Sequence, residues 1–305
     1  MCIRDRRIEL LNETEQVMYL ALLKDREKND NLDIIIHEKQ NNKTIIGDIF
    51  PKDALQQNLR ENPTIHIGKQ ISVNRDLEIP LDTDSYSNIL LLGPKSDKFY
   101  NISINILINC LKSIVLKTVY INILAPSTNG SKTDSLFLKK IENLTLENFV
   151  RVVAPKDLDE FLKEENEKIA DPESDSTIVN LFLGLDRMID QFLNKDGKDL
   201  LSNLQKLIAQ GPAQGHHNVV WSSFQDPLMT ILDKNYIRKF RHVIEFKGLA
   251  NSQILSSKEM ASTYFLSDVG VYKDFDPDNE SGYLIFRPFI LPTKEETLDF
   301  LDRLQ

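Results

Sequence analysis

Short apolar segments alternate with amphipathic segments along most of the chain. Residues 87–111 set this pattern, because the apolar run NILLL leads through a Gly-Pro turn into apolar positions at helical spacing. That order predicts a strand buried inside a sheet, then a loop of the size that holds phosphate groups, then a helix. A β-branched run at 118–124 predicts another strand that is buried on both faces.

The same criteria place further elements along the chain. Strands are predicted at 64–68, 70–74, 88–92, 118–124, 149–153, 177–183, 217–222, 241–247, 268–273 and 282–287. Amphipathic helices are predicted at 155–170, where the charged residues are expected to face solvent, and at 186–193, 198–210 and 227–239. Thr293 and Glu296 form a capping-box pattern that opens a closing helix. Strands that alternate with helices predict an α/β fold with a mainly parallel sheet and helices on both faces.

The sequence suggests a division into three parts. Residues 1–30 are expected to form a connecting helix, residues 31–63 a small α/β lead-in segment, and residues 64–305 the main domain. The opening MCIRDR has neither the apolar core nor the cleavage site of a signal peptide and looks like an artefactual start. We therefore expect the sequence to begin inside a longer protein.

Composition narrows the class of protein. The 46 acidic and 37 basic residues give a formal charge of -9, which argues against a surface that binds nucleic acid or anionic lipid throughout. The cysteines are Cys2 and Cys110, and Cys110 lies in an apolar helical segment that predicts a buried thiol and a reducing, cytoplasmic compartment. Lys112 and Lys117 interrupt the longest apolar region, so no direct membrane insertion is expected.

Several motifs together resemble a known family. They are IVNLFLG with DRMIDQF, the segment LQKLIAQGPAQGHHNVVWSS, and the pair IEFKGLANSQILSS and GYLIFRPFILP, besides the loop after NILLL. Between about 64 and 292 the order resembles the motor domain of the FtsK/SpoIIIE class of P-loop DNA translocases, whose relatives include type VII secretion ATPases. The most specific match consists of Gln210, Gly211, Gly215, His216 and His217. The resemblance implies a RecA-like P-loop fold, and within the family it is closest to a degenerate C-terminal domain of a multi-domain ATPase.

The loop at the phosphate-binding position lacks the residues that bind phosphate. A working loop reads Gly-x-x-x-x-Gly-Lys-Ser/Thr, in which backbone N–H groups and the lysine hold the phosphates and the hydroxyl binds magnesium. Lys98, Phe99 and Tyr100 occupy its last three positions. The whole degenerate loop is Gly93, Pro94, Lys95, Ser96, Asp97, Lys98, Phe99 and Tyr100.

Two further positions of the family's site also differ. The resemblance puts Gly184 and Leu185 where active members carry the carboxylates that orient magnesium and the attacking water. Asp186 follows them, and we interpret it as the N-cap of the next helix. In the alternative interpretation, the alignment is shifted in register and Asp186 is a metal ligand. Ser222 and Ser223 stand at the sensor position, which is polar in active members.

These differences predict that the domain hydrolyses no ATP and acts as a regulatory or scaffolding module. Its expected partner is an active ATPase domain, either in the same longer chain or in a ring neighbour. No cofactor and no metal are expected, and His216 and His217 are interpreted as turn residues without a third metal ligand near them.

Two alternative functions stay open at this point. In the first, Lys95, Lys98 and Asp186 bind ATP and Mg²⁺ weakly and support slow hydrolysis. In the second, the domain contacts DNA through basic residues that helical spacing would align on one face, namely Lys234, Arg238, Lys239 and Arg241.

Overall fold

The computed structural model describes residues 64–70, 75–83, 86–93, 102, 105, 106, 110, 119–124, 150–171, 176–193, 197–223, 225–246, 270–276 and 283–289. The chain divides into two compact units, 1–41 and 42–305, and all of the described residues belong to the second. The connecting helix expected at 1–30, the lead-in at 31–63 and the closing helix after Thr293 lie outside the described residues.

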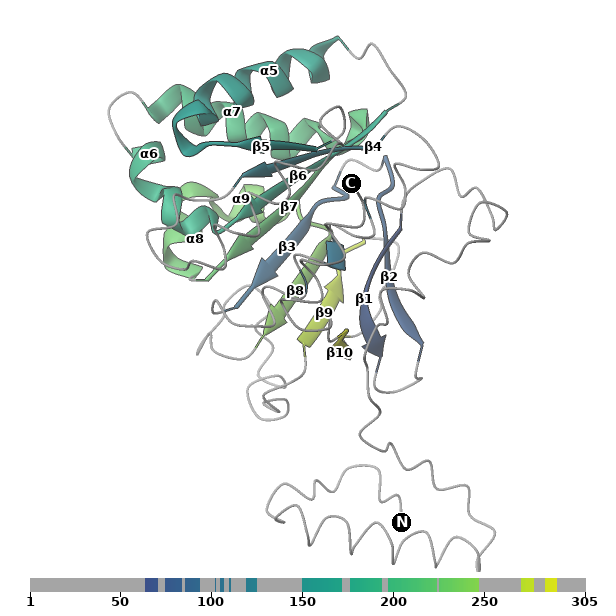
Figure 1. Cartoon of the computed structure of the whole chain (residues 1–305). Coiled ribbons are helices and arrows are strands. Elements are labelled where there is room, and N and C mark those ends of the chain that lie inside the picture. The colour runs from purple at the N-terminus through teal and green to yellow at the C-terminus, as the bar shows by residue number, and fades with distance from the viewer. Residues whose placement is uncertain are drawn as a thin grey trace, which may run out of the picture. The chain divides into compact units, whose positions relative to one another are not determined.

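The described strands form one ten-stranded sheet, in the order β2-β1-β10-β9-β8-β3-β7-β6-β4-β5 (Figure 1). Strands β8, β3, β7, β6, β4 and β5 are mutually parallel, whereas β9, β10, β1 and β2 add antiparallel pairs at one side. The expected α/β fold with a mainly parallel sheet is therefore confirmed. The strands are β1 Thr64–Gln70, β2 Asp76–Pro80, β3 Ile89–Leu92, β4 Val119–Leu124, β5 Val150–Val153, β6 Thr177–Leu183, β7 His216–Ser222, β8 His242–Phe246, β9 Gly270–Asp274 and β10 Leu284–Pro288.

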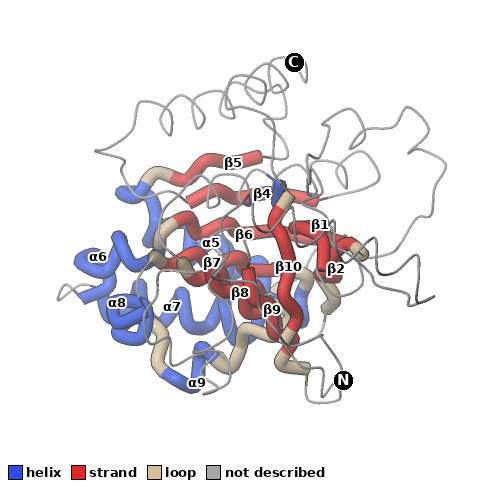
Figure 2. Tube along the Cα trace, turned by 90° about the horizontal axis from the view of Figure 1, so that it is seen from below, coloured by secondary structure: helices blue, strands red, loops and turns tan. Residues whose placement is uncertain are grey.

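Helices of the described residues cover one face of the parallel strands (Figures 1 and 2). They are α5 Leu158–Ala170, α6 Ile189–Leu193, α7 Gly197–Gln210, α8 Gln225–Ile231 and α9 Lys234–Ile237, with the short 3₁₀ helices η2 Pro155–Asp157, η3 Leu185–Met188 and η4 Pro212–Gln214. The helix predicted at 227–239 is thus broken into α8 and α9. Asp233 causes a new start, because its carboxylate accepts hydrogen bonds from the backbone N–H groups of Asn235 and Tyr236.

The central strand β3 is buried on both faces, which explains its uninterrupted apolar sequence. Leu90 and Leu92 pack with the helices α5 to α8, whereas Ile89 and Leu91 pack into a second core on the opposite face. The helical residues Ile102, Ile106 and Cys110 belong to that second core. Burial raises the pKa of the Cys110 thiol to about 12, so the predicted inert, buried cysteine is confirmed.

A chain of buried asparagine side chains crosses four neighbouring segments of the sheet. The Asn122 amide donates to the side-chain oxygen of Asn180 (2.8 Å), and Asn180 donates to that of Asn218 (3.2 Å). Asn218 donates to the side-chain oxygen of Asn88 (2.8 Å), just before β3. Asn88 then donates to the carbonyl oxygens of Ile208 and Lys239, both at 2.9 Å. This series of asparagine hydrogen bonds therefore joins β4, β6, β7 and β3 to the helical layer.

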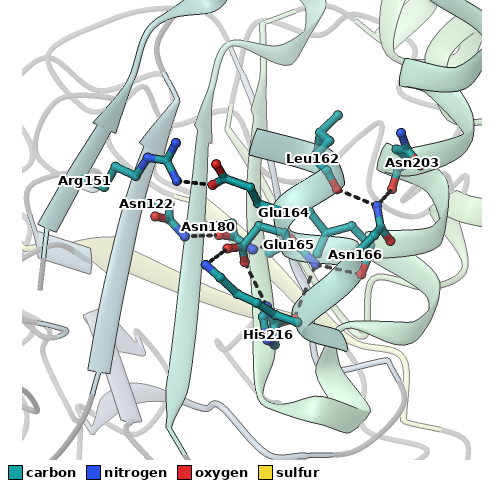
Figure 3. A network of polar contacts seen from close by, with 12 residues as sticks. Asn122, Arg151, Leu162, Glu164, Glu165, Asn166, Asn180, Asn203 and His216 are labelled. Carbon is teal, nitrogen blue, oxygen red and sulfur yellow. Dashed lines mark hydrogen bonds and ion pairs between the residues drawn. The ribbon is translucent and has the colours of Figure 1, made fainter. Parts of the chain in front are cut away.

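A second buried contact joins α5 to the start of β7 (Figure 3). His216 Nδ1 lies 2.9 Å from Glu165 Oε2, and Lys168 Nζ lies 2.6 Å from Glu165 Oε1. Burial tends to raise the pKa of Glu165, but the hydrogen bonds and charges of His216 and Lys168 together lower it. Two expectations are thereby corrected. Glu165 is fully buried rather than on a solvated face, and His216 and His217 lie in strand β7 rather than in a turn.

Replacing Asn180 by leucine tests the asparagine chain. The variant leaves the Asn122 amide and the Asn218 oxygen without their partners in a buried site, so we expect the free energy of unfolding to fall by about 2–4 kcal/mol. Urea denaturation measures this loss. Asn235→Ala, at an exposed side chain, is the matched control and should change stability by less than about 0.5 kcal/mol. Equal stability of the two variants would contradict the role given to the chain.

Candidate functional site

The residues predicted for the nucleotide site, where the structure describes them, meet at the carboxyl ends of β3, β6 and β7. The Gly93 N–H donates to the carbonyl of Ser222, and the Gly184 N–H donates to the carbonyl of Trp221, both at 3.1 Å. Parallel pairing of β3 with β7 and of β7 with β6 produces this meeting. The remaining loop positions, Pro94, Lys95, Ser96, Asp97, Lys98, Phe99 and Tyr100, lie outside the described residues.

A tryptophan fills the space beside the start of the loop. The indole Nε1 of Trp221 donates to the carbonyl of Gly93 (3.1 Å), and its ring stacks on Phe246, with centroids 6.2 Å apart. Gly93 has φ +155°, and a Cβ at this position would lie 2.9 Å from Cβ of Phe246. Glycine is therefore required at position 93 for packing as well as for backbone conformation.

The resemblance assigns the two carboxylate positions of the family to Gly184 and Leu185, neither of which carries a charge. Gly184 ends β6 in a left-handed conformation, with φ 97° and ψ 55°, and turns the chain into η3. Leu185 is fully buried in the core beneath the helices. This turn therefore places a buried aliphatic side chain directly after the end of β6.

Asp186 lies next to both sensor-position serines. It is 6% exposed, its Oδ1 accepts a 3.1 Å hydrogen bond from the Ser223 N–H, and the Ser222 side chain also donates to it. Burial raises the pKa of Asp186 against the lowering effect of these contacts. Gly184, not Asp186, is the N-cap of η3, so the N-cap interpretation is corrected: the carboxylate caps the end of β7.

Two other buried histidines lie at the opposite, amino-terminal ends of the strands. His217 Nδ1 lies 3.0 Å from the Ser87 carbonyl, and His242 Nδ1 lies 2.9 Å from the Tyr272 hydroxyl. The Nε2 atoms of both rings are buried without a hydrogen-bond partner. Burial lowers the pKa of each histidine to about 4, which keeps both rings neutral near pH 7.

The basic residues proposed for DNA contact do not share one helical face. Helix α9 ends at Ile237, so Arg241 lies beyond it. The Arg241 guanidinium instead lies 3.0 Å from Asp274, 2.8 Å from Asp276 and 3.8 Å from Asp82. Lys234 and Arg238 are exposed, and Lys239 is half-buried.

Comparison with solved structures identifies the fold. The chain matches the cytoplasmic domain of the type VII secretion ATPase EccC from Thermomonospora curvata at 11% identity and a TM-score of 0.57, over 88% of this chain and 33% of that one. It matches the pCW3 conjugation coupling protein TcpA, solved in its monomer form with ATPγS, at 12% identity and a TM-score of 0.56, over 93% and 86%. EssC (ATPases 2 and 3) from Geobacillus thermodenitrificans gives 13% identity and a TM-score of 0.53, over 94% and 51%.

The chain has the fold of FtsK/SpoIIIE-type P-loop ATPases. The resemblance seen in the sequence is thereby confirmed at the level of the fold. The chain spans about a third of the EccC cytoplasmic domain and about half of the EssC structures. No protein-family model and no curated protein sequence matches the chain. Among the described helices, none is long and apolar enough to cross a membrane.

Sequence reasoning missed two contacts of this FtsK/SpoIIIE-like fold. Trp221 lies in the strand predicted at 217–222 and is buried, but its hydrogen bond to the Gly93 carbonyl was not predicted. It also treated Glu165 as a surface charge, although Glu165 falls on the same helical face as the buried Leu158, Phe161 and Leu162. That position in the apolar stripe was the available signal.

Asp186 provides a test of its capping role. Asparagine keeps an oxygen that accepts from the Ser223 N–H and removes a buried charge, so Asp186→Asn should keep stability within about 1 kcal/mol of the parent. Asp186→Leu leaves the Ser223 N–H unpaired and should lose about 1–3 kcal/mol. Thermal and urea unfolding measure both variants. A strong loss with asparagine but not with leucine would overturn the capping role.

Acid should destabilise the domain through His217 and His242. Both have a pKa of about 4 when folded and 6.5 as the reference value, so between these values the unfolded chain binds protons that the folded chain does not. Stability should therefore fall with decreasing pH, by about 1.4 kcal/mol per pH unit for each histidine within the window. Urea unfolding between pH 7 and pH 5 measures this slope. His242→Phe should reduce the slope, and an unchanged slope would contradict the assignment.

Proposed function

We propose that this chain is an FtsK/SpoIIIE-type ATPase domain whose own nucleotide site is inactive, and that it serves as a regulatory or scaffolding module of a larger translocase-type ATPase. The observation that carries the proposal is the carboxyl end of β6. The resemblance puts Gly184 and Leu185 at the positions of the two carboxylates. Leu185 is packed into the apolar core. Asp186, the next residue, caps β7.

The energetics of phosphoryl transfer support an inactive nucleotide site. Phosphoryl transfer is accelerated almost entirely by positioning and by charge that compensates the transferred group. At the ends of β6 and β7, the carboxylate of Asp186 already accepts a hydrogen bond from the Ser223 N–H, and burial raises its pKa. Glu245 is a second carboxylate near this site, on β8 in register with Leu92. The sequence adds Lys98 and Phe99 at the positions where glycine and lysine hold phosphates.

A scaffolding role is consistent with the size of the match. The chain spans about a third of the cytoplasmic domain of the type VII secretion ATPase EccC and about half of an EssC structure that contains ATPases 2 and 3. We infer that the partner is an active ATPase domain, in the same longer chain or in a ring neighbour, and that the assembly is cytoplasmic. The intact β3-β7-β6 arrangement would then be retained for packing surfaces.

Weak nucleotide binding is the second candidate function. Asp186 lies beside Ser222 and Ser223 at the strand ends, which is the edge where ATPases of this fold hold nucleotide. Lys95 and Lys98 would supply the phosphate contacts, with ATP and Mg²⁺ as ligands. TcpA, a match of this fold, was solved with ATPγS.

Calorimetry with Mg-ATP separates the two candidates. For the 1–305 chain we expect no binding heat at millimolar nucleotide and no phosphate release above the background rate. Lys98→Ala and Asp186→Asn should leave both results unchanged. Binding or hydrolysis that either variant abolishes would overturn the inactive-site proposal and support the second candidate.

A further inference from the structure

Two cationic side chains face each other across the antiparallel strands β1 and β10. Lys69 of β1 and Arg287 of β10 are direct partners in the register of this pair. Phe286, the residue before Arg287, belongs to the second core, on the face of the sheet opposite α5 to α8. Because neighbouring residues of a strand point to opposite faces, Arg287 and its partner Lys69 both point to the other face.

The described helices leave this part of that face uncovered. The core that includes the helices takes its strand residues from β3 to β8, and none of the described residues of β1, β2, β9 or β10 belongs to it. Figures 1 and 2 show these helices over the parallel strands. Lys69 and Arg287 are both half-buried, so each keeps some contact with solvent.

The two cations lack acidic partners. Arginines elsewhere in the domain are paired, Arg151 with Glu164 and Arg241 with Asp274. In contrast, the ion pairs of the described residues include neither Lys69 nor Arg287, although like charges directly opposite destabilise a strand pair. The Nε–H of Arg287 is buried without a hydrogen-bond acceptor, which is also destabilising.

The acidic side chains nearest in register lie on the other side of Lys69. Asp76 of the edge strand β2 is directly opposite Lys69, but its Oδ2 lies 3.9 Å from His66 Nδ1. Glu78 is opposite His66, with Oε1 4.0 Å from the same nitrogen. Because β1 lies between β2 and β10, Asp76 offsets part of the charge of Lys69 and leaves Arg287 without a counter-charge.

This cationic pair lies at the same edge of the sheet as the candidate nucleotide site, but apart from it. Phe246, at the carboxyl end of β8, pairs with Gly270, which pairs with Phe286. Arg287 and Gly93 are therefore at one edge, where open α/β sheets bind ligands. Strands β8 and β9 separate β3 from β10, and three strand spacings correspond to about 14 Å.

Charge and hydrogen-bond donors favour a phosphate group as the ligand. The guanidinium of Arg287 alone can pair with the two oxygens of a carboxylate, which would leave Lys69 uncompensated. A phosphate group carries about 1.5 to 2 negative charges near neutral pH and has three acceptor oxygens, which suits both cations. Glu245 points to the same face from β8, beyond β9, and repels any long polyanion that extends toward it.

We propose that Lys69 and Arg287 form a binding site for a phosphate group, either free orthophosphate or the monoester of a small molecule. Its oxygens accept hydrogen bonds from the Arg287 guanidinium and the Lys69 ammonium. Gly68 lets the two strands approach, because a Cβ there would collide with the Arg287 carbonyl oxygen. The proposal is independent of the inactive nucleotide site, since it uses neither Asp186 nor the loop at 93–100.

Isothermal titration calorimetry of the 1–305 chain tests the site. The probes are orthophosphate and AMP, both without magnesium and at matched ionic strength, and acetate is the carboxylate comparison. We expect orthophosphate to bind with a dissociation constant of about 1 mM or lower, and acetate at least tenfold more weakly. Tighter binding of AMP than of orthophosphate identifies a monoester as the ligand, whereas weaker binding of AMP identifies free phosphate.

Matched variants locate the binding. Lys69→Ser and Arg287→Ser should each weaken orthophosphate at least tenfold. Arg287→Lys keeps the charge without the planar fork and should weaken it severalfold. Asp76→Asn removes the acid opposite Lys69 and should tighten binding severalfold. Replacing the exposed Arg238 and Lys206 together by serine removes the same charges elsewhere and should have little effect.

Thermal unfolding separates a binding role from a structural one. Without phosphate, Lys69→Ser should melt at or above the temperature of the parent, because the repulsion between like charges is relieved. With about 20 mM orthophosphate the parent should melt at a higher temperature, and the variant should not. A variant that melts far below the parent without phosphate would instead show that Lys69 is needed for the fold, and would overturn the proposal.

The contrary binding results are distinct. No saturable binding up to about 20 mM orthophosphate, equal binding of acetate, or binding that neither Lys69→Ser nor Arg287→Ser weakens would overturn the proposal. Magnesium neutralises the terminal phosphates of ATP, so this site should add nothing to the Mg-ATP heat. Mg-ATP heat that Asp186→Asn abolishes and Arg287→Ser retains would overturn the inactive nucleotide site alone.

Discussion

The arrangement of this domain depends on the buried amide chain that ends on Asn88. Each asparagine from Asn122 to Asn218 donates to the side-chain oxygen of the next, so the hydrogen bonds all run in one direction across the sheet. Asn88 closes the series by donating to backbone carbonyls of the helical layer. A buried amide without a hydrogen-bond partner destabilises the fold. The hydrogen bonds of these asparagines can all form only when the strands have this order and register.

That constraint determines which residues meet at both ends of the strands. Fixing Asn88 beside Asn218 sets β3 against β7, and the same register brings Gly93 to Ser222 at the carboxyl ends. At the amino-terminal ends it places Ser87 against His217, within hydrogen-bond distance. The contacts of Gly93 and of Ser87 therefore lie at opposite ends of the same pair of strands.

The sequence was informative wherever burial alone decides the structure. Runs such as 89–92 and 177–183 are apolar because both of their faces are covered, and their strands appear as predicted. It failed where a single polar contact decides. Strand β2 shows an alternating burial pattern that its charged residues concealed, and the break before α9 depends on the capping geometry of Asp233. Arg241 was taken as a helical surface cation because its acidic partners Asp274 and Asp276 lie more than thirty residues away.

The candidate site shows the same limit, and its packing bears on the inactivity that we propose for it. The sequence shows that the residues at these positions differ from those of active family members. It does not show which side chains pack around them. The indole of Trp221 binds the Gly93 carbonyl and stacks on Phe246, and Leu185 contributes to the core. A carboxylate at position 185 would have to be buried among apolar side chains, where its charged form is disfavoured. Under the proposed inactive site, the packing of Leu185 therefore opposes a carboxylate at this position independently of the residues that the loop carries.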